Sequence, residues 1–358
     1  QAVLDRVNGI NSAGLVTGYR GSPLGGVDAT FTKAEKFLKK NNIKFQYGLN
    51  EDLAATAIWG SQQTELRNEG KYDGVFGLWY GKGPGVDRCG DVFRHSNLAG
   101  TSKYGGVLVA MGDDHSAESS TELHQSEYAL VDAMMPILSP AGVQDILDFG
   151  IKGWALSRYS GLWVGIKCLK DTIEVTEVVD AAYDRIKIVD PQDKDHEELN
   201  IRLGDTPPAR EDRLHNKKLR AAKIFARANK LDKVDYSPTE KKIGIISAGK
   251  SWLDTVHALS LLGIDREEAE KYKLTTLKLG MVWPIDDSFV KDWADGLDKI
   301  LVVEEKRGLI ESQVKEALYG MVNSPKIIGK HDDNGELLLP SNGVLDPIIV
   351  GKAIANKL

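Results

Sequence analysis

The sequence predicts an α/β protein in which a parallel-sheet domain is followed by a smaller α/β domain. Short apolar runs alternate with helical patterns twice along the 358 residues, and the connections are long enough to return the chain across a sheet. A polar stretch with two consecutive prolines separates the two alternations. A content of 42% hydrophobic and 27% charged residues is typical of an ordinary globular protein.

The first alternation fills the amino-terminal part of the chain. Its apolar runs are bounded by glycine or proline, which predicts buried strands at residues 13–19, 43–48, 73–80, 105–112, 135–140 and 161–169. Helices are predicted near residues 25–40, 51–69, 86–98, 124–134 and 142–157. On the second of these helices, the expected buried face is Leu53, Ala54, Ala57, Ile58 and Gly60.

Residues 181–240 interrupt the alternation and predict a linker. Polar residues and Pro207-Pro208 come first, and a basic helix is expected near residues 211–230. Strand–helix units resume from residue 241, and a last amphipathic helix is expected at the carboxyl end. The predicted domains are therefore residues 1–180 and 241–358.

Charge, hydropathy and cysteine content exclude several classes of protein. A net charge of −6 without a basic block argues against nucleic-acid binding. No apolar run reaches the roughly 18 residues of a membrane span, and no charged-then-apolar leader is seen, so we expect a cytoplasmic protein. Cys89 and Cys168 alone exclude a disulfide framework and an iron–sulfur cluster held by this chain by itself.

Three polar segments follow predicted strands, where open α/β sheets bind ligands. GYRGSPLGG (18–26) and YGKGPGVDRCGD (80–91) are glycine-rich and could bind an anion or could be tight turns. GDDHSAESSTELHQSE (112–127) contains Asp113, Asp114, His115, Glu118 and His124, which could form a metal site. The first three could serve a metal-dependent hydrolase. Such residues also cap helices, and their spacing matches no common metal signature, so no metal site is expected.

Two further clusters of charge lie at the ends of predicted strands. Glu51 begins the helix near 51–69, where an acidic residue is usually a cap that suits the helix dipole. In the second domain, Glu304, Glu305, Lys306 and Arg307 follow a strand, and a surface ion-pair cluster is expected there. An interface with another domain is the alternative interpretation of that second cluster.

The order of the segments is more informative than any one of them. The two glycine-rich loops, LNEDLAATAIWGSQQ (49–63) and the segment 112–127 together resemble the amino-terminal part of the long-form indolepyruvate ferredoxin oxidoreductases. These enzymes belong to the thiamine-diphosphate-dependent 2-oxoacid:ferredoxin oxidoreductase superfamily. LDKILVVEEKRGLIESQVKEALY (297–319) resembles the family's next domain, which is similar to the transketolase carboxyl-terminal domain.

The resemblance implies a pyrimidine-binding domain followed by a transketolase C-terminal-like domain. It implies oxidative decarboxylation of a 2-oxoacid, by family expectation indolepyruvate or another arylpyruvate, to an acyl-coenzyme A. Electrons would pass through iron–sulfur clusters to ferredoxin. Glu51 would hydrogen-bond N1′ of the aminopyrimidine ring and favour the tautomer that removes the thiazolium C2 proton, a role that needs a carboxyl group held dry in a cleft.

The resemblance also implies further cofactor-binding residues in the loops around Glu51. They are Arg20, Gly21 and Ser22 bordering the cleft, Lys82, Gly83 and Pro84 lining it, and Ser119, Ser120 and Gln125 in a loop near the thiamine.

Two expected parts of such an enzyme are missing from this sequence. It has no GDG-type motif with a downstream Asn to hold Mg²⁺ and the diphosphate, and no cysteine run for clusters. We therefore expect a fragment or subunit that shares thiamine diphosphate and Mg²⁺ with a pyrophosphate-binding domain or subunit, is inactive alone and forms a homodimer. The alternative is a non-catalytic assembly or regulatory domain pair of the same fold.

Overall fold

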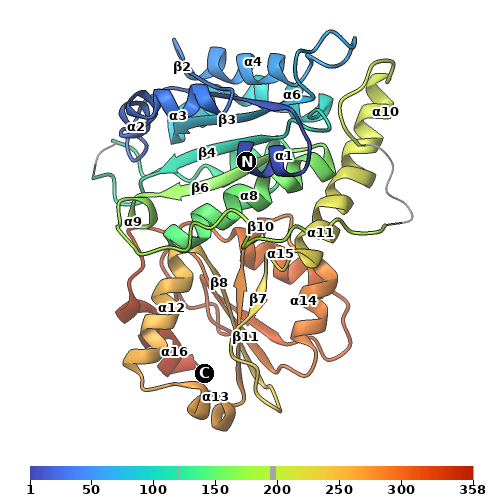
Figure 1. The fold of residues 1–358 in the computed structure, drawn as a ribbon. Helices are drawn as coiled ribbons and strands as arrows, with labels where there is room; N and C mark the ends of the chain where they lie inside the picture. The colour runs from blue at the N-terminus through green and yellow to red at the C-terminus, as the bar shows by residue number, and fades with distance from the viewer. Residues whose placement is uncertain (119–120, 194–198, 358) are drawn as a thin grey trace. The chain divides into compact units, whose positions relative to one another are not determined.

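The computed structural model describes residues 1–118, 121–193 and 199–357, and the chain forms two compact units (Figure 1). The first unit comprises residues 1–138 and 143–229, and the second comprises residues 139–142 and 230–358. Both units are built on mostly parallel sheets, which confirms the predicted fold class. None of the helices in the described ranges is long and apolar enough to cross a membrane.

The sheet of the first unit has the strand order β5-β6-β4-β3-β1-β2, and every one of these pairings is parallel. Every residue of β4 and β6 is buried, as expected for parallel strands that are covered on both faces. The strands are β1 (Ser12–Gly18), β2 (Ile43–Tyr47), β3 (Gly74–Lys82), β4 (Val107–Asp113), β5 (Ile137–Leu138) and β6 (Trp163–Leu169).

Helices cover both faces of this sheet, and two neighbouring residues of β3 show how. Gly77 faces α4 so closely that a Cβ atom there would lie 2.8 Å from Cγ2 of Ile58. Phe76 points to the other face, where its ring packs edge-on against Trp154 of α8 at 5.4 Å between centroids. Side chains alternate across a strand, so α4 and α8 lie on opposite faces.

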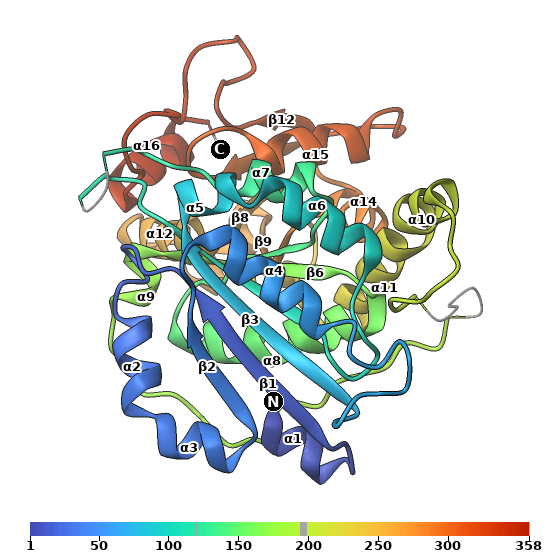
Figure 2. The ribbon, with the colours of Figure 1, turned by 90° about the horizontal axis from the view of Figure 1, so that it is seen from above.

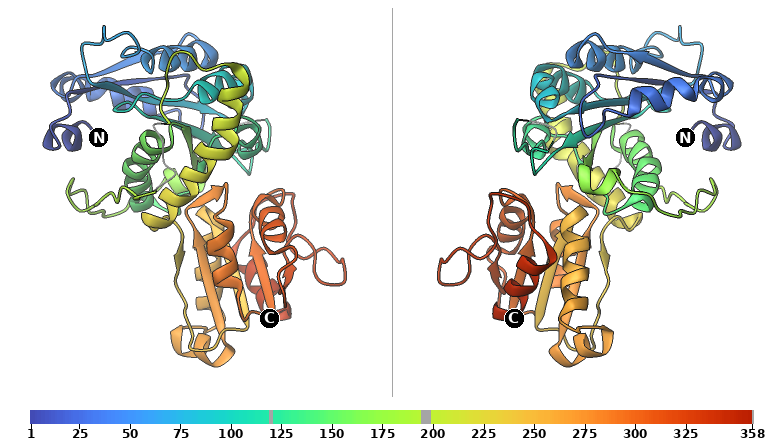
Figure 3. Two further views of the ribbon diagram at one scale, coloured as in Figure 1. Left: turned by 90° about the vertical axis from the view of Figure 1, so that its right-hand side faces the viewer. Right: turned by 90° about the vertical axis from the view of Figure 1, so that its left-hand side faces the viewer.

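The helices of the first unit follow the predicted order with finer divisions. The predicted helix 25–40 is split into α2 and α3, and 86–98 is split into α5 and α6. Helix α11 packs along α8 (Figure 3). The helices are α1 (Ala2–Val7), α2 (Val27–Lys33), α3 (Glu35–Lys40), α4 (Glu51–Ser61), α5 (Gly83–Arg88), α6 (Gly90–Ala99), α7 (Glu127–Asp132), α8 (Val143–Ser160), α9 (Lys170–Ile173), α10 (Pro207–Asp212), the π-helix η1 (Arg213–Lys218) and α11 (Leu219–Ala228).

Helix α4 ends at Ser61, well before the predicted residue 69, and the side chain of the next residue bonds to the sheet. The Gln62 side chain is fully buried, donates to the Val75 carbonyl at 2.7 Å, and accepts from the backbone N–H groups of Ser102 and Gly106. These bonds satisfy the Val75 carbonyl in β3 and two backbone N–H groups in the segment that precedes β4.

The predicted buried face of α4 is only partly correct. Three of its members, Leu53, Ala57 and Gly60, are exposed, whereas Ala54 and Ile58 are buried as expected. The buried positions of the helix are Glu51, Ala54, Ala55 and Ile58. An acidic residue therefore lies on the face that packs on the sheet, and a leucine on the face that does not.

The second unit has a smaller sheet with the order β12-β11-β8-β9-β7, parallel except for the β7–β9 pair. Its helices form two layers, one with α12 and α16 and one with α14 and α15, on the two sides of the sheet (Figure 1). The strands are β7 (Lys233–Val234), β8 (Ile243–Ala248), β9 (Leu274–Leu279), β10 (Met281–Trp283), β11 (Lys299–Val303) and β12 (Lys326–Ile328). The helices are α12 (Gly249–Leu261), α13 (Arg266–Tyr272), α14 (Asp287–Ala294), α15 (Leu309–Leu318) and α16 (Pro347–Lys357).

The charged cluster after β11 is not on the surface as predicted. Glu304, Glu305 and Lys306 are buried, and only Arg307 is exposed. Glu304 accepts hydrogen bonds of 2.8–2.9 Å from the first backbone N–H groups of α15, and burial raises its pKa to about 7. Glu305 and Lys306 bond to backbone groups of residues 343–345. The cluster therefore holds a helix and a loop of this unit in place.

Close packing at the start of β3 gives a first prediction. A Cβ atom on Gly74 would lie 2.3 Å from the carbonyl carbon of Tyr104, and backbone cannot move aside as a side chain can. We expect Gly74→Ala to lower the free energy of unfolding by about 2–3 kcal/mol in denaturant titrations. Gly60→Ala, at a site in α4 with nothing within 4 Å, is the matched control and should be neutral or stabilising by up to about 1 kcal/mol. Equal midpoints for the two variants would contradict the packing described.

Candidate functional site

The loops in which the site was predicted follow four neighbouring parallel strands, in the order β4-β3-β1-β2. Figure 2 shows β3, β1 and β2 side by side. Parallel strands bring their carboxyl ends to one edge of the sheet, where ligands bind in open α/β folds. The last residues of these strands are Gly18 of β1, Tyr47 of β2, Lys82 of β3 and Asp113 of β4. The structure therefore brings the loops together at one edge.

Glu51 is the first residue of α4, but it does not cap the helix. The cap is Asn50, whose side-chain oxygen accepts a hydrogen bond from the Leu53 backbone N–H at 2.8 Å. The Trp79 indole N–H donates to the Glu51 carbonyl at 3.1 Å and fixes its backbone. Glu51 is only 8% exposed, and within the described part of the chain its carboxyl group receives no hydrogen bond. A buried carboxyl group without a structural task is therefore held at the ligand-binding edge.

The short helix α5 packs one of its faces against Glu51. A Cβ atom on Gly85 would lie 2.6 Å from Cγ and 2.9 Å from Oε1 of Glu51, so only glycine allows this approach. One turn further along the same face, Arg88 donates to the Asp52 carboxylate at 3.0 Å. Helix α5 is thereby attached to the first turn of α4 at both of these residues.

The other face of α5 packs against His124. A Cβ atom on Gly83 would lie 2.3 Å from the His124 ring, and Asp87, four residues later, has its carboxylate 2.7 Å from Nε2 of that ring. The side chain of His124 is 14% exposed, whereas that of Asp87 is 57% exposed. The imidazole therefore lies in the protein, with its outer nitrogen paired at the surface.

The inner nitrogen of His124 faces a buried carboxylate at the end of β4. Asp113 is fully buried and accepts hydrogen bonds from the backbone N–H of Ser126 at 3.0 Å and from its hydroxyl at 2.5 Å. Nδ1 of His124 lies 3.2 Å from the Ser126 oxygen and 3.5 Å from Asp113. The single Ser126 hydroxyl proton goes to Asp113, so its oxygen can only accept from Nδ1. Since the Asp87 carboxylate also only accepts, both ring nitrogens carry protons and His124 is an imidazolium.

The charges around His124 shift several pKa values. Asp113, and after it Asp87, raises the pKa of His124 to about 9, although burial acts in the opposite direction. Burial acts to raise the pKa of Asp113, but His124, Lys167 and Ser126 together hold it below its ordinary value. Lys167 in turn pairs with Glu127 of α7. Every charge in this cluster therefore has an opposite charge beside it, as buried ions require.

The predicted loop of residues 20–22 lies against the end of β3. A Cβ atom on Gly21 would lie 2.8 Å from Cδ of Lys82, so these two predicted site residues are in contact. Arg20 is exposed, whereas Gly21 and Ser22 are half-buried. Pro84 lies in the first turn of α5, between the two glycines that contact His124 and Glu51.

The remaining predicted residues lie near the end of the loop after β4. Gln125 is half-buried and directly follows His124. Ser119 and Ser120 lie outside the described residues. The structure thus places Glu51, the 82–84 segment and the 124–125 segment around α5.

Asp113, Asp114 and His115 do not form a metal site in the part of the chain that the structure describes. Residues 1–118, 121–193 and 199–357 contain no group of three or more His, Cys, Asp or Glu side chains that could hold a metal ion. Asp113 instead binds Ser126 and His124. The geometry gives the metal-dependent hydrolase hypothesis no support.

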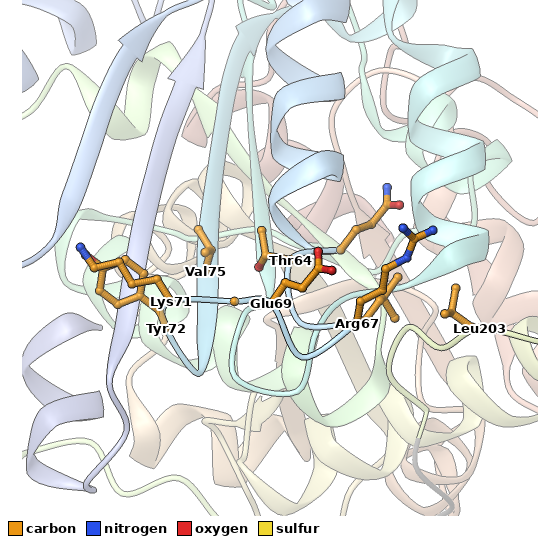
Figure 4. Close-up of a pocket in the computed structure, with 10 residues that line it drawn as sticks. Thr64, Arg67, Glu69, Lys71, Tyr72, Val75 and Leu203 are labelled. Carbon is orange, nitrogen blue, oxygen red and sulfur yellow. The ribbon is translucent and has the colours of Figure 1, made fainter.

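A pocket of about 560 Å³ lies away from these loops. It is lined by the turn that follows α4, by Val75 near the start of β3 and by Leu203 (Figure 4). Residues near the start of β3 lie at the opposite end of the strand from Lys82, so this pocket is separate from the predicted site.

Sequence reasoning did not find Gly85, Asp87 or His124 as parts of this arrangement. The glycines of KGPG were interpreted as a loop for an anion or a turn, and His124 was considered only as a possible metal ligand. The available signal was the spacing of Gly83 and Asp87, which puts them on one helix face, with Gly85 and Arg88 on the other. No sequence pattern identifies the side chains that those faces contact.

Comparisons with known proteins identify relatives of this chain. Residues 233–358 match the indolepyruvate oxidoreductase domain family. Indolepyruvate oxidoreductase subunit IorA of Methanothermobacter marburgensis is 25% identical over 304 residues, covering 85% of this chain and 46% of that protein. The subunit of the same name from Pyrococcus horikoshii is 24% identical over 307 residues, covering 84% of this chain and 44% of that protein. The chain therefore spans less than half the length of these relatives.

Solved structures share the fold across the whole chain. A 2-oxoglutarate:ferredoxin oxidoreductase from Magnetococcus marinus, with 2-oxoglutarate, coenzyme A and succinyl-CoA bound, matches with a TM-score of 0.65 at 14% identity, over 99% of this chain and 63% of that one. A split-gene transketolase in an inactive beta4 tetramer matches with a TM-score of 0.57 at 16% identity, over 99% of this chain and 94% of that one. At these identities the likeness concerns the fold.

The His124 cluster gives a prediction about stability and pH. The pKa of His124 is raised from 6.5 to about 9 in the folded state, so its stabilising contribution is complete below pH 6.5 and is lost as the pH rises through 9. We expect His124→Gln to lower the free energy of unfolding by about 1.5–3 kcal/mol at pH 6 and by much less at pH 9.5, measured by denaturant titration.

The control is His95→Gln, which removes an exposed imidazole 3.4 Å from the exposed Asp91. This substitution should change stability by about 0.5 kcal/mol or less at either pH. A loss of stability in His124→Gln that is the same at pH 6 and pH 9.5 would show that His124 is not charged.

Proposed function

Because this is an IorA-like chain of the 2-oxoacid:ferredoxin oxidoreductase family, distantly homologous over most of its length, we propose that it is the pyrimidine-binding part of an indolepyruvate or other arylpyruvate ferredoxin oxidoreductase. The reaction is the oxidative decarboxylation of the 2-oxoacid to an acyl-coenzyme A. The chain supplies the carboxyl group that activates the cofactor, and it is inactive without the rest of the enzyme.

The observation that carries this proposal is the state of Glu51. It lies buried at the start of α4, at the carboxyl edge of a parallel sheet. Asn50, and not Glu51, caps the helix. Its carboxyl group receives no hydrogen bond within the described part of the chain, so it is available to a ligand. Burying a carboxyl group without a partner lowers the stability of the fold. Such groups are therefore found mainly at functional sites.

The buried carboxyl group of Glu51 suits the aminopyrimidine ring of thiamine diphosphate. A buried carboxyl group can accept a hydrogen bond or donate one, which is the chemistry required opposite a ring nitrogen. When bound, the cofactor would supply a nucleophilic carbon to the 2-oxo group of the substrate. Glu51 would hold a proton at N1′ of the aminopyrimidine ring, and α5 would keep its carboxyl group in place.

The loops around α5 would complete the chain's share of the cleft. Arg20, Gly21 and Ser22 would border it, and Lys82, Gly83 and Pro84 would line it. Lys82 and the exposed Arg20 place positive charge beside the edge, which suits the carboxylate of a 2-oxoacid or a cofactor phosphate. Ser119, Ser120 and Gln125 would approach the thiamine from the loop after β4.

The remainder of the enzyme would come from further domains or subunits. Relatives are more than twice as long as the aligned part of this chain, which leaves room for a pyrophosphate-binding domain and iron–sulfur clusters. Leu49 is 85% exposed and Leu53 is 51% exposed, on either side of Glu51. Apolar residues beside a functional carboxyl group suit contact with the domain that completes the cleft. We propose that Mg²⁺ and the diphosphate bind there, that ferredoxin accepts the electrons, and that the enzyme is a cytoplasmic homodimer.

The second candidate function is a non-catalytic pair of domains that serves assembly or regulation. Gly85 argues against this non-catalytic function. The fold alone does not require a glycine packed against a buried carboxyl group such as that of Glu51. Loss of chemistry would leave both residues free to change.

Substitution of Glu51 tests the proposed function. In enzyme reconstituted by coexpression with the pyrophosphate-binding part, Glu51→Gln should lower kcat at least about 100-fold, because the amide cannot hold a proton at the ring. Electron transfer to ferredoxin with indolepyruvate and coenzyme A is the measurement. Gly60→Ala, on the same helix and in open space, should leave the rate within about twofold. If Glu51→Gln retained full activity, this role would be wrong.

Isolation of the chain tests whether the cleft is shared. Calorimetric titration of the chain alone with thiamine diphosphate and Mg²⁺ should show binding at least about 100-fold weaker than that of the reconstituted enzyme, because the diphosphate contacts would be missing. Affinity equal to that of the whole enzyme would place the complete site on this chain.

A further inference from the structure

We propose that His124 is a positioning residue that holds Glu51 in place through helix α5. The inference rests on the proposed function of Glu51, and it adds a residue that the proposal does not contain. His124 has no contact with Glu51, so it would act only through the helix between them.

Helix α5 lies between His124 and Glu51, and each of its two opposite faces contacts one of them. Gly83 and Asp87 contact the His124 ring, and they lie one turn apart on one face. Gly85 and Arg88 lie on the other face, against Glu51 and its neighbour in α4. Each face is in van der Waals contact with its partner at a glycine, so a shift of the helix at one face must appear at the other.

The six residues of α5 cannot fix the position of the helix by themselves. A helix this short has too few backbone hydrogen bonds to be stable alone, so its place is set by its contacts. On the outer side, those contacts are an ion pair of Asp87 and the packing of Gly83, and both are made with the same imidazolium. These contacts add to the packing of α5 on α4, α6, β3 and β4, and they join the helix to the segment that follows β4. We infer that they set how closely α5 lies against Glu51.

The imidazolium is in turn fixed from the protein interior. Its Nδ1 faces Asp113 of β4 and the Ser126 oxygen, and its Nε2 faces Asp87 of α5. Behind Asp113, Lys167 of β6 lies 4.0 Å away and pairs with Glu127 of α7. With the proton, His124 bridges two carboxylates; without it, one of the two bonds is lost and the two carboxylates are no longer screened from each other.

The consequence for the enzyme is a dependence of kcat on the charge of His124. Below the pKa of His124, near 9, the bridge is complete and α5 is held against Glu51; above it the bridge opens. Activity would then fall on the alkaline side as His124 loses its proton. Removal of Asp87 should move this fall to lower pH, because the Asp87 carboxylate helps to raise the pKa of His124.

The first experiment uses the chain without cofactor. It measures whether the charge of His124 affects the surroundings of Glu51. Histidine-selective ¹⁵N labelling of the seven histidines, with His124 assigned through His124→Gln, should show both ring nitrogens protonated at pH 7. The Trp79 indole N–H, which donates to the Glu51 carbonyl, should titrate with the same midpoint near 9, and this titration should vanish in His124→Gln. Asp87→Asn should lower both midpoints together. A neutral His124 at pH 7, or a Trp79 signal that does not follow it, would overturn the inference.

The second experiment measures the effect on the reaction. In the reconstituted enzyme, His124→Gln and Asp87→Asn should each lower kcat about tenfold, with the KM for the 2-oxoacid within twofold, because the geometry at Glu51 is lost and not the substrate contacts. The double variant should lose no more than either single one, since all three break the same bridge. Asp87 is exposed, so Asp87→Asn provides the test if His124→Gln folds poorly.

Controls separate this inference from the proposed function. His95→Gln removes an exposed His–Asp pair on α6 and should leave kcat and its pH profile unchanged. The positioning role would be overturned if the kcat losses of the two single variants multiplied in the double variant. It would also be overturned if Asp87→Asn did not shift the fall of kcat at alkaline pH. If Glu51→Gln is fully active, the proposed function has failed, and the Trp79 titration still decides whether His124 controls the surroundings of Glu51.

Discussion

The site edge of the first sheet depends on one buried carboxylate, that of Asp113. It has no exposed surface, and a buried charge without partners would cost several kcal/mol. Ser126, His124 and Lys167 supply the partners, and each must come from the segment that follows β4 or from β6. Satisfying Asp113 therefore holds His124 and Ser126 at the end of β4 and favours a charged His124. Through Asp87, His124 in turn contacts the helix that follows β3.

The glycines at this edge are explained by that arrangement. Gly21, Gly83 and Gly85 each leave no room for a Cβ atom, because Lys82, His124 and Glu51 respectively occupy the space. The glycine-rich loops thus allow side chains from neighbouring segments to approach the backbone, a need different from the anion binding suggested by their composition. Close packing also makes the edge stiff, and a catalytic carboxyl group has to be held within about half an ångström.

The sequence was sufficient to predict the fold class and most strands, because buried parallel strands leave continuous apolar runs bounded by turns. The helical face of α4 was assigned wrongly in part, since Leu53 and Ala57 fit a helical period as well as Ala54 and Ile58 do, and periodicity does not say which stripe meets the sheet. The charges of Glu304–Lys306 were placed on the surface because their partners, backbone groups of α15 and of a distant loop, leave no pattern in sequence. Glu51 was reached through family resemblance, and the contact of Gly85 with it required coordinates.

The exposure of Leu49 and Leu53 suits the proposed function, in which this chain would carry one side of a cleft. Burying both on association would remove apolar area from water, which favours binding, and would at the same time dry the surroundings of Glu51. The same contact would then stabilise the assembly and strengthen electrostatic interactions of the carboxyl group, because both follow from excluding water. In the proposed assembly, the carboxyl group of Glu51 would become fully dry only when its partner is bound, so association and activation would be coupled at this edge.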